Sequence, residues 1–255
     1  MTERLIARRS LLGGLTLGAG GLLLAGCDKL NASPNVRGFL EGAEQLHYRS
    51  QRFLGGGSAM AREYARADMS PDFRVNGSSG PTSPAYAALA AGNFADWRLV
   101  VDGLVARPLE LSLTQLGSFP QRAQITRHDC VEGWSAIGKW QGPQLASILR
   151  AAGMSSRANF LVFHCADEEG GTPYYESIDL NDAFHPQTIL ALLMNDHRLS
   201  VPHGAPMRLR VERQLGYKHA KFVMRIEARD RIDNLYLGKG GYWEDRGDYA
   251  WYAGI

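Results

Sequence analysis

The chain has 255 residues, of which 45% are hydrophobic and 21% charged, and its formal net charge is +2. Residues 1–27 hold three Arg and one Glu, so the chain without them has a formal net charge of zero. This balance argues against a nucleic-acid partner. The roughly 228 residues that follow can bury one full hydrophobic core, so we expect one domain.

The first 27 residues are typical of an export signal. Residues 7–12 contain a twin-arginine pair, followed by a glycine-rich apolar stretch of about 17 residues, which is short for a membrane span of ~20. Leu24-Ala25-Gly26-Cys27 then matches a lipobox, in which Cys27 receives a lipid and becomes the first mature residue. Asp28, directly after Cys27, resembles the signal that holds enteric lipoproteins in the inner membrane. We predict a periplasmic protein with a lipid anchor in the inner membrane. Because the twin-arginine route carries folded proteins, it also indicates a cofactor inserted before export.

The rest of the chain is predicted to form an N-terminal extension and one domain. Residues 28–70 are polar and glycine-rich, which indicates a tether with a short helix, and residues 71–85 are typical of an irregular loop. The hydrophobic pattern then predicts, in chain order, strands at 97–105 and 107–113, a short helix starting at Thr114, a strand at 124–126, a helix at 144–152 ended by Gly153, a strand at 159–165 with a hairpin partner at 174–178, short helices at 180–184 and 189–194, and strands at 207–211 and 222–228. With no internal repeat, residues 71–255 are expected to form one α+β domain.

Cys130 is the first residue whose surroundings indicate chemistry. His128 lies two residues before it, so the two could act as a thiol–imidazole pair, although catalytic Cys and His are usually distant in sequence. A zinc site would need further Cys or His ligands at suitable spacing, and the sequence has no C-x-x-C or H-x-x-x-H motif. A single thiolate suits a metal whose other ligands come from a cofactor.

Cys165 is the only other cysteine beyond the signal. In an exported protein it could form one disulfide with Cys130. Two cysteines in a domain of this size do not make a disulfide scaffold, so we expect two separate thiols.

A second cluster lies at 195–208 and 216–221. Pro and Gly around His203 predict a rigid turn, and Arg208, Lys218 and Lys221 follow it. A guanidinium binds phosphate with a fork of donors and an ammonium adds a point charge, so the cluster favours an anionic, phosphate-bearing cofactor. Arg210 and Arg213 belong to an alternating pattern along the strand, so we expect their side chains to lie on its solvent-exposed face rather than to bind the cofactor.

Together these motifs resemble the sulfite oxidase-like molybdopterin oxidoreductases, in particular the periplasmic methionine sulfoxide reductase catalytic subunit branch. The resemblance covers about residues 70–255 and is carried by 97–113, by the Cys130-Val131-Glu132-Gly133-Trp134-Ser135 loop, and by 203–208 with 216–221. It implies a single sulfite oxidase-type domain with mixed sheets and short helices. It also implies molybdenum held by one molybdopterin and by the thiolate of Cys130.

The same resemblance implies the residues that contact the cofactor. His203 stands where the branch has Asn, Cys165 where relatives have Ser or Thr, and residues 76–80 depart from the branch's pattern. The implied contacts are Asn76, Ser79, Gly80, Cys165, His203, Arg208, His219, Ala220 and Lys221.

Glu132 occupies the position where the resemblance places a carboxylate near the metal. A carboxylate would repel sulfite, so Glu132 favours a neutral substrate such as a sulfoxide. It could relay protons or only shape the loop by a hydrogen bond. Arg127 could point into the site or pair with Glu132, and Trp134 is expected in the core.

These observations predict reduction of a sulfoxide, such as protein methionine sulfoxide, with Cys130 and Glu132 as catalytic residues. No C-x-x-C-H motif is present, so an external electron carrier, such as a membrane haem protein, is expected. The alternatives are a sulfite-oxidising dehydrogenase of the same fold, a non-catalytic pterin-binding lipoprotein, and a thiol enzyme using Cys130 and His128. The aromatic segment 240–252 is expected to be an ordered tail, with a wall of the substrate funnel or a partner surface as alternatives.

Overall fold

The computed structural model describes residues 33–54 and 59–255, and the chain divides into two compact units, 1–51 and 52–255. The predicted export signal and lipidated Cys27 lie outside the described residues. The extension contains a helix, α2 (Pro34–Leu54), but with 21 residues it is not the short helix expected. Within the described ranges, none of the helices combines the length and apolar character that a bilayer crossing requires.

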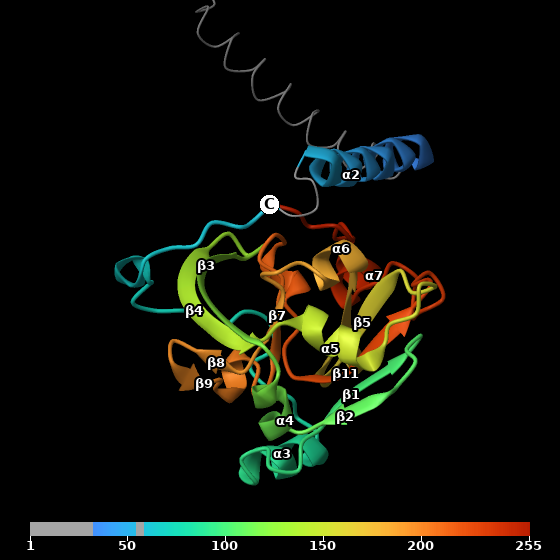
Figure 1. The fold of residues 1–255 in the computed structure, drawn as a ribbon. Coiled ribbons are helices and arrows are strands. Elements are labelled where there is room, and N and C mark those ends of the chain that lie inside the picture. Colours follow the sequence, from blue (N-terminus) through green and yellow to red (C-terminus); the bar gives the residue numbers. More distant parts are fainter. Residues whose placement is uncertain (1–32, 55–58) are drawn as a thin grey trace, which may run out of the picture. The chain divides into compact units, whose positions relative to one another are not determined.

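The larger sheet of the second unit has five strands (Figure 1). Its strands in spatial order are β2 (Leu109–Leu111), β1 (Leu99–Gly103), β11 (Val223–Arg229), β5 (Phe160–Glu169) and β6 (Thr172–Asp179). Only the β1–β11 pair is parallel. Both predicted hairpins are confirmed, since β1 pairs with β2 through Leu99 and Leu111, and β5 pairs with β6.

A second sheet, of four strands, carries the cysteine loop. Its strands in spatial order are β3 (Gln121–Asp129), β4 (Ser135–Pro143), β8 (Leu193–Met194) and β9 (His197–Arg198). The hairpin of β3 and β4 is in register along its whole length, from Gln121 opposite Pro143 to Asp129 opposite Ser135. Residues 130–134 are therefore its tip.

A two-stranded sheet joins β7 (Ile189–Ala191) to β10 (Arg208–Arg210). The prediction of a helix at 189–194 is wrong, because this segment forms strands β7 and β8. A short apolar run does not distinguish a buried strand from a buried helix. Here β7 is buried throughout, and the backbone of β4 lies so close that a Cβ on Gly142 would overlap the carbonyl oxygen of Leu190.

Short helices connect these sheets. The predicted α5 (Leu145–Ala152) is confirmed, with Gly153 ending it in a left-handed conformation at φ 67°. The predicted α4 (Leu113–Ser118) also forms, but its cap is Ser112, which accepts a hydrogen bond from Gln115 N. The remaining helical segments are η1 (Arg66–Asp68), α3 (Pro84–Ala91), α6 (Leu180–Ala183), η2 (Val201–His203), η3 (Gly216–Lys218) and α7 (Tyr242–Gly247).

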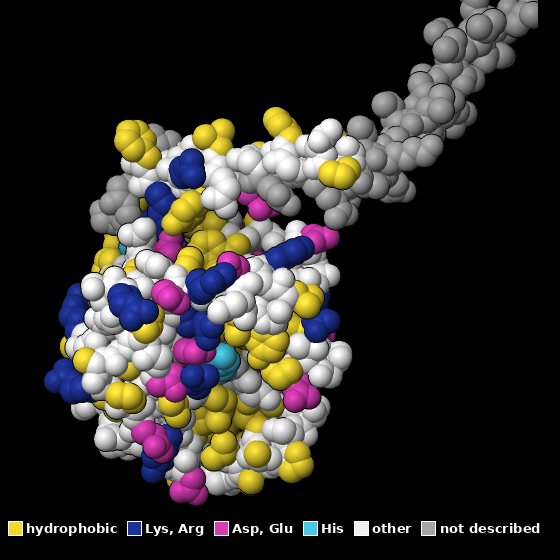
Figure 2. All heavy atoms as spheres, turned by 90° about the vertical axis from the view of Figure 1, so that its right-hand side faces the viewer, with side chains coloured by type: hydrophobic (Ala, Val, Ile, Leu, Met, Phe, Trp, Pro, Cys, Tyr) yellow, Lys and Arg dark blue, Asp and Glu magenta, His cyan; other side chains and the backbone are white. Residues whose placement is uncertain are grey.

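The main core lies between the five-stranded sheet and α5, where Leu99, Leu161 and Ile226 of the sheet pack with Ile148 and Leu149 of the helix. The segment 59–70 lies along β3, with Tyr64 N donating to Ile125 O at 2.9 Å. On the face in Figure 2, basic and acidic side chains are interspersed, which agrees with the neutral composition.

Candidate functional site

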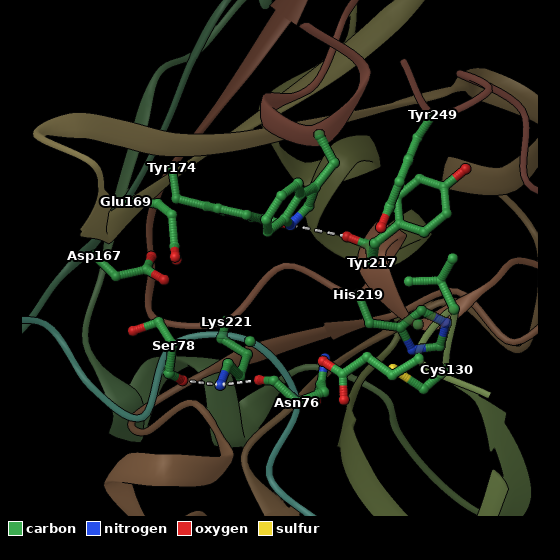
Figure 3. Close-up of a pocket in the computed structure, with 15 residues that line it drawn as sticks. Asn76, Ser78, Cys130, Asp167, Glu169, Tyr174, Tyr217, His219, Lys221 and Tyr249 are labelled. Atoms are coloured by element: carbon green, nitrogen blue, oxygen red, sulfur yellow. Dashed lines mark hydrogen bonds between the residues drawn. The ribbon is translucent and has the colours of Figure 1, made fainter. Parts of the chain in front are cut away.

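A cavity of about 250 Å³ lies next to the tip of the β3–β4 hairpin (Figure 3). Its walls come from residues 76–78, from 130–132, from β5 and β6, and from segments within 216–221 and 243–249. Asn76, Cys130, Glu132, His219 and Lys221 of the sequence prediction line it together.

The hairpin tip holds Cys130 against the cavity. Cys130 N donates to Trp134 O at 2.9 Å, and Gly133 N donates to Cys130 O at 3.0 Å. This tight turn requires a positive φ at Gly133, 85°, which glycine adopts without strain. Burial raises the pKa of the Cys130 thiol, and the N–H groups of Glu132 and Val131 act in the opposite direction. A metal ion bound to the sulfur would favour the thiolate form.

His128 does not pair with Cys130. Its side chain is 1% exposed, and its Nδ1 lies 3.0 Å from Nη1 of Arg210. Burial and the charges of Arg208 and Arg210 hold the pKa of His128 well below its usual value. Within the described part of the chain no hydrogen bond joins the two side chains, so the thiol-enzyme alternative lacks the pair it needs.

The two free cysteines are confirmed as separate thiols. Cys165 lies on β5 and donates to Phe163 O at 3.8 Å, outside the cavity wall.

Two buried cations meet at Asn76. Lys221 lines the cavity, and its Nζ donates to the carbonyl oxygens of Asn76 (2.7 Å), Ser78 and Pro202 (3.1 Å). Arg208 lies behind Asn76, fully buried, and donates from Nη2 to Asn76 Oδ1 at 3.0 Å. Burial and the neighbouring charge of Arg208 lower the pKa of Lys221 to about 7. Burial and the neighbouring charge of Arg210 lower the pKa of Arg208 to about 9.

The acceptors around these two cations are neutral. In the described chain, Nε and Nη1 of Arg208 have no hydrogen-bond partner, although both are buried. Buried donors without acceptors are costly, so the pair forms a cluster that an anion would complete.

His219 and Ala220 flank this cluster. His219 lines the cavity, with Nε2 3.0 Å from Gln214 O and no partner for Nδ1 among the described residues. Ala220 is fully buried and its carbonyl oxygen accepts from Leu209 N at 2.8 Å, which fixes the backbone between His219 and Lys221.

Besides Cys165, three further predicted contacts lie away from the cavity and its cation cluster, namely His203, Ser79 and Gly80. His203 has its ring nitrogens 2.9 Å from Ser200 Oγ and 3.0 Å from Phe73 O. Ser79 is exposed, and Gly80 packs so closely on Val201 that a Cβ would lie 2.9 Å from it. Ser78, which the sequence analysis did not select, lines the cavity in their place.

The carboxylate of Glu132 is exposed and accepts a hydrogen bond from Trp134 Nε1 at 3.0 Å. Arg127 pairs with Asp129 at 2.9 Å, so neither role expected for it is observed. Trp134 is half-buried and packs at the edge of a smaller core cluster, with its ring 6.1 Å from that of Phe73.

The structure corrects the expectation for the arginines after Arg208. Arg210 is fully buried, and its Nη2 lies 2.5 Å from Glu212 Oε2. Arg213 is half-buried and pairs with Asp182 at 2.7 Å. Alternation of charge along a strand does not reveal contacts with distant segments, such as that of Arg210 with His128 or of Arg213 with Asp182, so the predicted solvent-exposed face is wrong.

Sequence analysis missed part of the cavity wall. Asp167 and Glu169 of β5 and the aromatic rings of Tyr174 and Tyr217 line it. From the aromatic tail at 240–252, Trp243 and Tyr249 also contribute, and their rings stack at 5.7 Å. For this tail the sequence analysis gave a wall of the substrate funnel as an alternative to an ordered tail, and its aromatic richness was the signal.

Comparisons with known proteins place this chain among molybdopterin proteins. The family model described as "Oxidoreductase molybdopterin binding domain" matches residues 87–236. The chain is 37% identical over 253 residues to an Azospira oryzae protein named "Putative protein-methionine-sulfoxide reductase subunit YedZ1", covering 99% of this chain and 87% of that protein. It is 32% identical over 147 residues to "Protein-methionine-sulfoxide reductase catalytic subunit MsrP" of Campylobacter jejuni, covering 53% of this chain and 50% of that protein.

A solved structure, the sulfane dehydrogenase SoxCD from Paracoccus pantotrophus, is similar with a TM-score of 0.51 and 23% identity. The match covers 55% of this chain and 40% of that chain, and it supports the fold alone.

The residues at the cavity fit molybdopterin. Cys130 offers a soft thiolate ligand for molybdenum. Lys221 in the wall and the unpartnered donors of Arg208 behind Asn76 suit the phosphate group.

Proposed function

The chain belongs to the molybdopterin-binding oxidoreductases, and we propose that it reduces a sulfoxide, such as methionine sulfoxide in a protein. The observation that carries the proposal is a cavity that Cys130 shares with Lys221, with Arg208 behind its wall, whose Nε and Nη1 have no hydrogen-bond partner among the described residues. The names of the two relatives supply the substrate class.

Each polar group at the cavity has a distinct task in this proposal. The thiolate of Cys130 holds molybdenum, Lys221 and Arg208 bind the cofactor phosphate, and Asn76 keeps Arg208 in place. When bound, the molybdenum cofactor supplies oxygen-atom transfer coupled to two electrons. Reduction of a sulfoxide consumes two electrons and two protons and yields a thioether and water.

Glu132 favours sulfoxide over sulfite as the substrate. Its exposed carboxylate lies two residues after Cys130, where a negative charge disfavours the approach of an anion but not of a neutral sulfoxide. Trp134 Nε1 donates to Oε2 of Glu132, which holds this carboxylate at the hairpin tip beside Cys130. A sulfite-oxidising dehydrogenase of the same fold is the alternative.

The cellular setting forms part of the proposal. The twin-arginine pair and the lipobox support export to the periplasm and a lipid anchor at Cys27 in the inner membrane. The sequence carries no C-x-x-C-H haem motif, so the electrons are expected from a separate carrier, such as a membrane haem protein.

Metal analysis combined with two activity assays tests the function. Protein from a molybdenum-competent host should contain about one molybdenum per chain and should oxidise a reduced dye with methionine sulfoxide. Cys130→Ser should lower this activity by at least about a thousandfold, because the variant loses its covalent hold on the metal. Cys165→Ser, which removes the thiol outside the cavity, is the matched control and should keep the metal.

The other outcomes separate the alternatives. Wild-type protein without molybdenum would contradict the enzyme assignment and favour a non-catalytic lipoprotein. Sulfite turnover without sulfoxide turnover would overturn the role given to Glu132.

A further inference from the structure

One side of α2 presents three large apolar side chains to solvent. Phe39, Leu46 and Phe53 are 75%, 67% and 86% exposed. Seven residues make about two turns of an α-helix, so the three side chains stand in one row, the apolar stripe of α2. Single exposed apolar residues are ordinary on a protein surface, but an aligned row of them indicates a contact surface.

The surroundings of the apolar stripe are compatible with a lipid contact. Ala43 and Ser50 lie between the three residues by the same helical period, and both are small. Arg49 lies at the edge of the stripe, is exposed, and forms no ion pair within the described residues. A long basic side chain beside an apolar surface can bury its stem and keep its charge among polar headgroups. This combination is typical of a helix that lies in a membrane–water interface.

The opposite side of α2 has partners within the chain. Arg52, the first residue of the second unit, lies there by the helical period. Its Nη2 is 2.7 Å from both Asp179 and Asp182, and its side chain is only 12% exposed. The chain thus uses one side of the helix for its own contacts and leaves the apolar stripe for another partner.

The position of α2 in the sequence favours a lipid surface as this partner. The helix begins at Pro34, seven residues after Cys27, the site of the lipid anchor in the proposed function. Seven residues span at most about 25 Å when fully extended, so an acyl group on Cys27 would hold the helix near the bilayer. Apolar side chains held at that distance gain free energy by moving from water to the outer part of the acyl chains.

A second copy of the chain fits the apolar stripe less well. Two helices that pack as a coiled coil need apolar residues at two positions of each seven-residue repeat. The stripe supplies one of these positions. The residues available for the other are small or polar, namely Gly42 with Arg49 or Ala43 with Ser50.

We propose that α2 lies along the membrane surface, with the apolar stripe buried at the boundary between the headgroups and the acyl chains of phospholipids. The helix is then a second membrane contact besides the lipid on Cys27. This inference rests on the lipid anchor of the proposed function and not on its substrate, so failure of the sulfoxide assay does not affect it.

Tryptophan fluorescence of the reconstituted holoenzyme tests this orientation. Leu46→Trp places an indole in the stripe, and the mature protein is reconstituted into phosphatidylethanolamine–phosphatidylglycerol vesicles with brominated acyl chains, which quench tryptophan on contact. Gln45→Trp, at the adjacent exposed position on another side of the helix, is the matched control. The fluorescence that Leu46→Trp adds to the five native tryptophans should be quenched severalfold more strongly than that added by Gln45→Trp.

Replacement of the flanking phenylalanines tests whether the stripe causes the contact. In the Leu46→Trp protein, Phe39→Gln with Phe53→Gln should lower the quenching severalfold, although Gln is a good helix former. Phe39→Leu with Phe53→Leu keeps an apolar stripe and should retain the quenching. Loss of quenching in both double variants would assign the two residues to the structure of the helix and overturn the inference.

The remaining outcomes separate the other partners. Equal quenching at positions 45 and 46, or none at position 46, would overturn the inference. A dimer in which the Leu46→Trp indole is shielded from aqueous iodide but not quenched by brominated lipid would assign the stripe to a second copy. The mass of the mature N-terminus reports the acyl group separately. If that group is absent, the protein is added to preformed vesicles and the same quenching is measured, so failure of the anchor and failure of the stripe are distinguished.

Discussion

The two arginines of β10 are equally buried but have different partners. Arg210 lies 2.5 Å from the carboxylate of Glu212, whereas Arg208, two residues earlier, donates to the neutral side chain of Asn76 and forms no ion pair within the described residues. Both guanidinium groups also face Trp140, at 4.2 Å and 5.4 Å from its ring. The surroundings are thus similar, and the difference lies in the counter-charge.

The two lysines that follow repeat this contrast. Lys218 is fully buried between Glu176 at 2.5 Å and Glu244 at 2.7 Å. Burial alone would lower the pKa of Lys218, but the two carboxylates raise it above its usual value. Lys221 is bound by three carbonyl oxygens, and its pKa falls to about 7. Cations that the chain neutralises support the fold, and those it leaves with neutral acceptors are available to an anionic ligand.

Substitution of the two arginines should separate these roles most strongly. Arg210→Met leaves Glu212 buried without its cation, so the cofactor-free protein should lose about 3–5 kcal/mol of unfolding free energy. Arg208→Met removes a buried guanidinium with two unpartnered donors, so the unfolding free energy should stay unchanged or increase. Denaturant unfolding of the cofactor-free proteins measures both.

Cofactor content should follow the reverse order. Arg208→Met should retain several-fold less pterin per chain than the wild type, and Arg210→Met, where it is folded, should retain about as much. Equal losses of stability in the two variants would contradict the distinction between them.

Loss of Lys218 should have a smaller effect than loss of Arg210. Burial and the neighbouring Glu244 raise the pKa of Glu176 well above its usual value, so one carboxyl group can stay protonated when the ammonium is removed. Lys218→Met should therefore cost on the order of 2 kcal/mol at neutral pH. The double variant Lys218→Met/Glu176→Gln should recover part of this loss. No recovery would indicate that packing of the Lys218 side chain, rather than its charge, is what matters.

Local sequence was sufficient to predict much of this protein. The family, the α+β fold and the molybdopterin cofactor are confirmed, because the motifs around Cys130 and around Arg208 and Lys221 are each contiguous in sequence. The β5–β6 hairpin and the end of α5 at Gly153 were also predictable from short-range patterns.

The remaining features depend on contacts between distant segments. Arg210 is buried where its Nη1 lies 3.0 Å from Nδ1 of His128 in β3 and its guanidinium faces the ring of Trp140 in β4, and no local pattern contains that information. The strand at Ile189–Ala191 forms because β10 supplies its partner. Asp167 gave no signal in sequence, because its burial in the cavity wall is a property of the assembled fold.

The smallest effect expected is a pH dependence that belongs to Lys221 and not to Lys218. The pKa of Lys221 is about 7 in the folded chain and has a usual value of 10.5, so the unfolded chain binds more protons between these values. The difference in unfolding free energy between the cofactor-free wild type and Lys221→Met should therefore rise in favour of the wild type as the pH increases through this window. The expected rise is about 1 kcal/mol from pH 7 to 8, and the difference should be constant well below pH 7. Urea unfolding at a series of pH values measures the difference. A bound phosphate group should restore the ammonium charge, so the holoenzyme should lose this dependence. The same slope in wild type and Lys221→Met would mean that Lys221 is neutralised within the chain, as Lys218 is.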